Sequence, residues 1–231
     1  MKLWKRSMNR AVCLLIAGGL SGSPGALIAV PGAATPVRVA LGQGSTLWLE
    51  GTSTMHDFES RTSAVSLSFT RDPAAAEPAD PAAFEALVRD SAITGLDVEI
   101  PVDSLHSGKS GLDKNLEKAL RAAQNPAIRF HLSHYAWKPA GASPDSFEIE
   151  AKGTLNVAGK DQPVTLAAHA RRVASGLWVD GTQELLMTSF DVQPPKLMFG
   201  ALKVGDRITV HYRLLLSPVT TGAIASPGRS Q

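Results

Sequence analysis

The side chains most able to do chemistry here are histidines, serines and acids, and none follows a familiar catalytic pattern. His56 and Asp57 are the one suggestive pair, inside a polar segment at 51–60. Neighbouring residues at a turn cannot easily aim an imidazole–carboxylate pair at a nucleophile, and the chain has neither a GxSxG elbow nor an SxxK pair. We therefore interpret the pair as local hydrogen-bonding residues of a turn and expect no catalytic residues and no enzyme activity.

Metal and nucleotide sites are not indicated either. The segment 103–110, DSLHSGKS, resembles the end of a phosphate-binding loop, but Asp103 stands where the first glycine belongs, and no parallel βαβ pattern surrounds it. No histidine pair has a spacing suited to a metal, and no cluster of acids accompanies one. The sequence thus predicts no metal and no cofactor, with ordinary roles for its histidines, which are His56, His106, His131, His134, His169 and His211.

The chain opens with four basic residues and no acid in its first ten positions, followed by an apolar run at 11–20 and then small residues. That order predicts a secretory signal peptide over residues 1–34, cleaved after Ala34, with Ala26 and Ala29 as alternatives. The apolar run is too short to span a bilayer. We therefore expect a periplasmic or secreted protein.

Removal of this segment changes both the charge and the thiol content. The 23 basic residues fall to 19 against 21 acids, so the formal balance becomes 19 − 21 = −2. A nucleic-acid partner has no support from such a charge. The one cysteine, Cys13, lies within the segment, so the remaining chain can form no disulfide and its stability must come from its core.

The stretch from Leu47 to Phe69 sets the pattern that the rest of the chain repeats. Two predicted strands flank the polar segment 51–60, and in each of them apolar residues alternate with others, as a sheet with one buried face requires. The apolar positions of this predicted hairpin are Leu47, Leu49, Val65, Leu67 and Phe69.

One-faced strands are also predicted at 35–41, 92–102, 128–132, 147–155, 164–171, 177–187 and 208–216. Asp80 before Pro81 predicts the N-cap of a short helix through Val88. An apolar stripe at helical spacing predicts a second helix over 112–123, packed against the sheet. The polar segment 217–231, with its glycine and proline, is predicted to be disordered.

Eight or so strands joined mostly by short turns indicate an antiparallel sheet. A sheet of that size with one apolar face must form a sandwich or close into a barrel. The apolar faces and scattered aromatic residues then allow two interpretations: they fill the interior, or they line a cavity for a hydrocarbon chain. Burial of such a chain contributes about 0.8 kcal/mol per CH₂, so binding would need no polar motif.

Several segments, in this order and spacing, resemble the YceI-like family of exported proteins. They are LEGTSTMHDF at 49–58, IPVDSL at 100–105, NPAIRF at 125–130, GTLNVAG at 153–159 and PVTL at 163–166. The resemblance covers about 46–216. It implies an all-β fold, a lipocalin-like eight-stranded antiparallel β-barrel with one flanking α-helix, at 35–216, and a long apolar cavity that in some members holds a polyisoprenoid.

From the strands and the resemblance we predict a protein that binds a polyisoprenoid or another lipid-like small molecule. Its polar head would lie near Lys109 or Lys196. The alternative is a non-enzymatic envelope scaffold or stress protein with a filled barrel that acts through its loops, and a homodimer is left open. The predicted cavity lining is Leu47, Leu49, Val65, Leu67, Phe69, Val98, Ile100, Ile128, Phe130, Phe147, Ile149, Val164, Leu166, Val210 and Tyr212.

Overall fold

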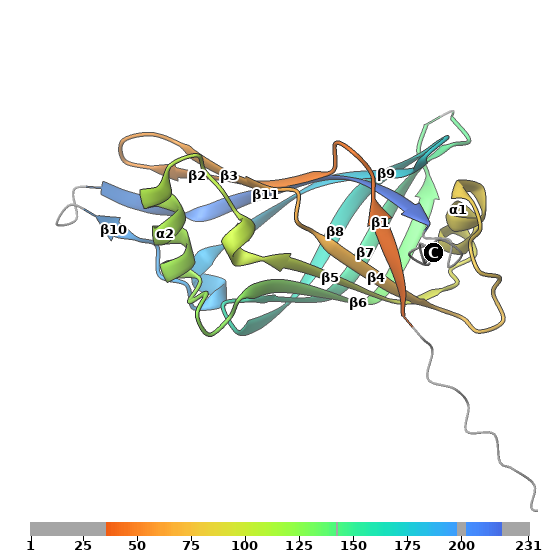
Figure 1. Cartoon of the computed structure of the whole chain (residues 1–231), viewed down its shortest axis with the longest axis horizontal. Coiled ribbons are helices and arrows are strands. Elements are labelled where there is room, and N and C mark those ends of the chain that lie inside the picture. The colour runs from red at the N-terminus through yellow and green to blue at the C-terminus, as the bar shows by residue number, and fades with distance from the viewer. Residues whose placement is uncertain (1–35, 142, 198–201, 219–231) are drawn as a thin grey trace, which may run out of the picture. The chain divides into compact units, whose positions relative to one another are not determined.

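A computed structural model describes residues 36–141, 143–197 and 202–218 (Figure 1). The predicted signal peptide and most of the predicted tail lie outside these residues. The strands are β1 (Val37–Leu41), β2 (Thr46–Ser53), β3 (Phe58–Thr62), β4 (Ser66–Arg71), β5 (Ile93–Pro101), β6 (Ala127–Pro139), β7 (Ser146–Val157), β8 (Lys160–Val173), β9 (Gly176–Leu186), β10 (Lys196–Leu197) and β11 (Leu202–Pro218). The helices are α1 (Pro81–Arg89) and α2 (Ser110–Ala119), with short 3₁₀ turns η1 (Val102–Ser104) and η2 (Met187–Phe190).

The sheet closes on itself. Its strands pair in the order β1-β4-β5-β6-β7-β8-β9-β11, and β11 pairs in turn with β1. Every pairing in this ring is antiparallel. The predicted eight-stranded antiparallel barrel is therefore confirmed, and closure leaves the ring without a free sheet edge.

The predicted hairpin of two strands consists of four strands in the structure and has a shorter turn than expected. β2 continues the line of β1, and β4 continues that of β3, so the two strand pairs form one interrupted hairpin along the barrel (Figure 1). The polar segment 51–60 was expected to be a turn throughout, yet only 54–57 separates β2 from β3. Toward the α2 end, a backbone bridge between Arg61 and His106 ties β3 to the chain beyond β5.

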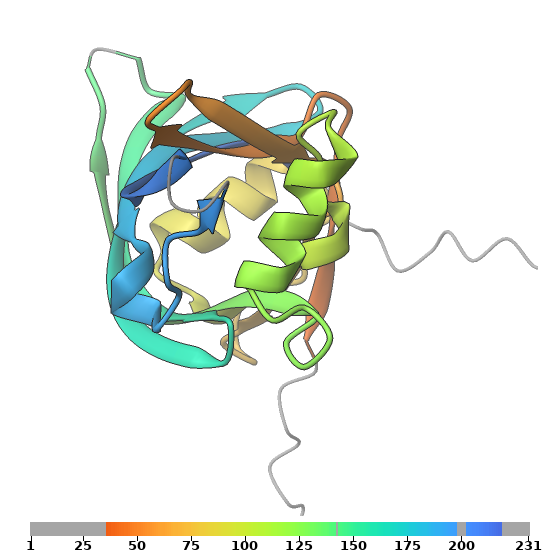
Figure 2. The ribbon, with the colours of Figure 1, turned by 90° about the vertical axis from the view of Figure 1, so that its left-hand side faces the viewer.

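Helix α1 begins where the sequence predicts. The Asp80 carboxylate accepts a hydrogen bond from the Ala83 N–H at 2.7 Å, and Pro81 occupies the first helical position, where its missing N–H costs nothing. Figure 2 looks along the barrel from its α2 end and shows α1 across the far end. Its buried face includes Phe84, Leu87 and Val88.

Helix α2 lies beside the opposite end of the barrel (Figure 2). It ends at Ala119, four residues before the predicted end, and turns follow through Gln124. The helix contains Leu112 and Leu116 of the predicted apolar stripe, but none of its residues is fully buried. The barrel thus has a helix at each end in place of the single flanking helix that the resemblance implied. None of the described helices is long and apolar enough to cross a membrane.

Candidate functional site: an apolar tunnel along the barrel

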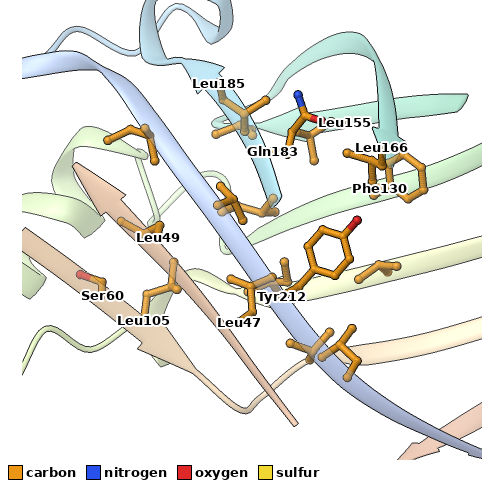
Figure 3. A pocket seen from close by; sticks show the side chains of 18 of the residues that line it. Leu47, Leu49, Ser60, Leu105, Phe130, Leu155, Leu166, Gln183, Leu185 and Tyr212 are labelled. Atoms are coloured by element: carbon orange, nitrogen blue, oxygen red, sulfur yellow. The ribbon is translucent and has the colours of Figure 1, made fainter. Parts of the chain in front are cut away.

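The barrel interior holds a cavity of about 380 Å³ that extends from α1 to α2, and we call it the tunnel. Along β11 its lining runs from Val204 to Leu216, and Figure 3 shows side chains from several strands pointing into it. The volume is within the range of about 300–1,000 Å³ typical of small-molecule sites. Among the described residues, no Asp, Glu, Lys or Arg lines it.

Twelve of the fifteen side chains predicted to line a cavity do line the tunnel. They are Leu47, Leu49, Val65, Leu67, Val98, Ile100, Ile128, Phe130, Ile149, Leu166, Val210 and Tyr212. Successive side chains of a strand point to opposite faces of the sheet, so residues of the inward parity lie inside the closed barrel. Whether they bind a ligand stays a prediction.

Phe69, Phe147 and Val164 do not line the tunnel, contrary to the prediction. Phe69 is covered by Phe84 of α1, with ring centroids 5.6 Å apart. Phe147 is fully buried beneath Trp137 and Arg89, in the part of the interior that α1 fills. Strand parity predicts the inward face but cannot show how far along the barrel α1 fills it.

Val164 is excluded for a different reason. It pairs with Gly153, and a Cβ atom at that glycine would lie 2.6 Å from the ring of Phe130. The aromatic ring therefore lies against the backbone of β7 at this level. We infer that Phe130, not Val164, forms this part of the wall.

The prediction missed the contribution of the helices and turns. Leu112, Leu116 and Leu120, from the stripe expected to pack on the sheet, line the tunnel at its α2 end. Leu112 and Leu116 are partly exposed because they border a cavity, whereas Leu120 is buried. Leu105 after η1 and Phe190 of η2 also contribute. The apolar stripe showed that α2 has a face to bury. Whether this face packs on the sheet or borders a cavity depends on the position of the helix in the folded protein.

The polar side chains of the lining are concentrated toward α2. Strand register places Gln183 of β9, Val210 of β11, Leu49 of β2 and Ser60 of β3 in one row, with Gln183 and Ser60 as its polar members (Figure 3). Gln183 lies three residues before the end of β9. The further polar lining residues nearer the α2 end are Ser53, His56 and Asn115. Toward α1 the hydroxyl of the lining residue Tyr135 is already bonded to the Val88 carbonyl of α1. The tunnel is therefore mainly apolar toward α1 and carries further hydrogen-bonding groups toward α2.

Tyr212 borders the apolar half and has its hydroxyl occupied. That hydroxyl donates to the Ala167 carbonyl at 3.0 Å. A Cβ atom at Gly181 would lie 2.3 Å from the hydroxyl oxygen of Tyr212, so the absence of a side chain at this glycine lets the phenol ring lie against the barrel wall. Burial, with a smaller contribution from the charge of Asp180, raises the pKa of Tyr212 to about 12.

The raised pKa of Tyr212 predicts a loss of stability in alkali. The unfolded chain releases this proton near the ordinary pKa of 10 and the folded chain near 12, so between these values the unfolded state holds fewer protons. The free energy of unfolding should fall as pH rises through this window. The free energy of unfolding, measured by urea denaturation at pH 9 to 12, should fall less steeply with pH for Tyr212→Phe than for the parent. Identical slopes would contradict the assignment.

The residues first singled out for chemistry are not assembled into a reactive group. His56 and Asp57 are exposed in the hairpin turn, where the Ser53 hydroxyl donates to the His56 carbonyl at 2.7 Å. His211 lies on the outer face, stacked on Trp48 with ring centroids 4.8 Å apart. Within the described ranges no group of three or more His, Cys, Asp or Glu could hold a metal ion.

Of the two lysines expected near a head group, the structure describes the side chain of Lys109 alone. Lys109 is exposed just before α2 and does not line the tunnel. The side chain of Lys196 lies outside what the structure describes. Among the described side chains, the polar groups that line the tunnel toward α2 are those of Ser53, His56, Ser60, Asn115 and Gln183.

Comparisons with solved structures support the same architecture. BcnA from Burkholderia cenocepacia matches with 19% identity and a TM-score of 0.54, covering 74% of this chain and 94% of that one. A polyisoprenoid-binding domain from Saccharophagus degradans, implicated in plant cell wall breakdown, matches with 11% identity and a TM-score of 0.56, covering 79% and 98%. At such identities the likeness shows the fold alone. No curated protein sequence matches.

The closed antiparallel barrel with an apolar interior defines a lipocalin-like class of protein. The model of the YceI-like domain matches residues 43–216, most of the chain. The chain therefore belongs to the YceI-like family, and the resemblance noted in its sequence is confirmed.

Proposed function

We propose that this protein binds one amphipathic lipid-like molecule, an isoprenoid or a similar chain, in the tunnel, and that it does so outside the cytoplasm after removal of its signal peptide. The observation that carries the proposal is a long cavity that ends at α1 and that no described Asp, Glu, Lys or Arg lines. Each CH₂ moved from water into such a cavity contributes about 0.8 kcal/mol. A chain alone can therefore supply the affinity.

The distribution of polar groups gives the ligand a direction. Its chain would lie toward α1, past the row of Gln183 and Ser60, and its head would lie at the α2 end, near Ser53 and Asn115. Among the described side chains, the lining supplies amides, hydroxyls and the imidazole of His56 but no Lys or Arg, which favours an uncharged head such as an alcohol, amide or quinone over a phosphate. The similar structure from Saccharophagus degradans is a polyisoprenoid-binding domain, which is consistent with this class of ligand.

The alternatives explain fewer observations. A scaffold with a filled barrel leaves the cavity of about 380 Å³ without a role. An enzyme would need reactive groups at the tunnel, and His56, the histidine that borders it, is held in a turn through its backbone. We therefore propose a binding protein without catalytic activity.

Blocking the tunnel provides the test of this function. Ala168 of β8 lines the tunnel, whereas the adjacent Ala167 is exposed on the outer face. We expect Ala168→Phe to lower the affinity for the neutral fluorescent probe N-phenyl-1-naphthylamine at least tenfold, because the ring occupies the space of the ligand. Ala167→Phe, the matched control, should bind as the parent does.

Circular dichroism and urea unfolding check that both variants fold. Loss of probe binding in Ala168→Phe alone supports the tunnel as the site. Equal binding by the two folded variants would place the probe elsewhere and contradict the proposal.

A further inference from the structure

We infer that α1 is a fixed floor of the tunnel and that Phe84 and Val88 on it determine the length of chain the protein accepts. Both side chains line the tunnel, although α1 is not part of the sheet. Figure 2 shows the helix across the far end of the barrel. The inference rests on the proposed function and adds a selectivity to it.

The helix is anchored to the barrel wall through its C-terminal carbonyls. The last carbonyls of a helix have no partner within it. Here the Tyr135 hydroxyl donates to the Val88 carbonyl at 3.0 Å, and the Trp137 indole N–H donates to the Arg89 carbonyl at 2.7 Å. Both donors come from β6.

Ion pairs and aromatic packing add to this attachment of α1. The Glu85 side chain is nearly buried and pairs with Arg89 at 2.6 Å and with Arg172 of β8 at 2.5 Å. The Arg89 guanidinium lies over the Trp137 and Phe147 rings, 4.8 and 4.6 Å from their centroids. Hydrogen bonds, ion pairs and aromatic contacts thus fix α1 in place at the end of the tunnel. The depth of the tunnel is therefore constant.

The strands give the scale of this depth. The lining on β11 spans residues 204 to 216. An irregularity between Val204 and Ile208 makes these four steps cover only the two steps from Ser53 to Gly51 on β2, so the span equals ten regular steps. Ten steps of about 3.3 Å along a strand tilted by about 40° extend roughly 25 Å along the axis. An extended chain covers about 1.2 Å per bond, because three backbone bonds span about 3.6 Å, so the tunnel holds about 21 bonds. This corresponds to roughly five isoprene units of four chain bonds each.

A chain of another length fits less well at one end or the other. A shorter chain leaves part of the apolar lining empty when its head is at the α2 end, near Asn115, and a longer one cannot pass α1 and leaves its excess in water. Each displaced methylene lowers the affinity about fourfold. The protein should therefore select for length, and not merely for hydrophobicity.

Uptake from a mixture measures this selectivity. The full chain is incubated with nonionic-detergent micelles that contain equal amounts of isoprenoid alcohols of three to nine units, and native mass spectrometry determines which are bound. Micelles provide an apolar reference phase, so general hydrophobicity cancels. We expect the bound distribution to peak near five units, at least tenfold above the shortest and longest alcohols.

Variants of α1 identify the floor. Phe84→Ala should move the peak by about one unit toward longer chains, because the lost ring deepens the tunnel. Val88→Ala, a milder change in case the first variant does not fold, should move it less in the same direction. Leu87→Ala is the matched control, since Leu87 is equally buried on α1 but does not line the tunnel, and its peak should not move.

The outcomes separate this inference from the proposed function. A bound mixture with the composition of the micelles, or a peak that stays in place in both Phe84→Ala and Val88→Ala, overturns the floor while leaving lipid binding intact. A peak that moves equally in Leu87→Ala also overturns it. A protein that takes up no alcohol of any length overturns the proposed function itself.

Discussion

Leu166→Asp should reduce the affinity for a neutral lipid-like ligand by more than 100-fold. Leu166 lies in the wall of the tunnel, with Phe130 and Leu155 nearby (Figure 3). A carboxylate there must be kept hydrated or buried without a partner, and burial of an unpaired charge costs several kcal/mol. The ligand would have to supply that energy. Titration with N-phenyl-1-naphthylamine, followed by displacement with geranylgeraniol, measures the loss.

The adjacent residue supplies the control for this variant. Thr165 is exposed on the outer face of β8 and pairs with Lys152 of β7. Thr165→Asp adds the same charge one residue away but outside the barrel, so its affinity should stay within about twofold of the parent. Comparable losses in both variants would show that net charge or folding, and not the tunnel, governs binding.

Phe147→Ala should lower the free energy of unfolding by about 3–5 kcal/mol. Phe147 is fully buried where α1 fills the barrel, and its ring contacts Trp137 and Arg89. Removal of the ring leaves a cavity that these fixed neighbours cannot close. The change in the midpoint of urea denaturation, at constant slope, measures the cost.

Phe130→Ala is the comparison that gives this measurement its meaning. Phe130 is also an inward-facing phenylalanine and is nearly buried, but its ring borders the tunnel. Its removal enlarges a space that already exists, so we expect a cost of about 2 kcal/mol or less, close to the transfer term alone. Equal costs for the two variants would indicate an interior that is packed throughout.

The sequence predicts the barrel well because a single physical rule repeats along the chain. A closed sheet with one apolar face needs alternating side chains, and Leu47, Leu49, Val98 and Ile100 show that alternation without reference to distant residues. The start of α1 is similarly local, because Asp80 and Pro81 are sufficient to specify it.

The parts that could not be predicted depend on contacts between distant segments. Phe69 and Phe147 share the inward parity of the lining, and only the position of α1 separates them from it. Leu116 looked like a residue packed on the sheet, because its direction depends on where α2 crosses the barrel end. The row of Gln183 and Ser60 arises from the register of four strands, which no local pattern reveals.

The barrel should enclose a chain-shaped molecule and not only its own side chains. Native mass spectrometry of the protein, purified from its own host without detergent, tests this most directly. We expect a single adduct that is lost under organic extraction and recovered as one hydrophobic compound with an uncharged polar head. A bare protein mass, together with failure to take up any isoprenoid alcohol from micelles, would contradict lipid binding in the tunnel.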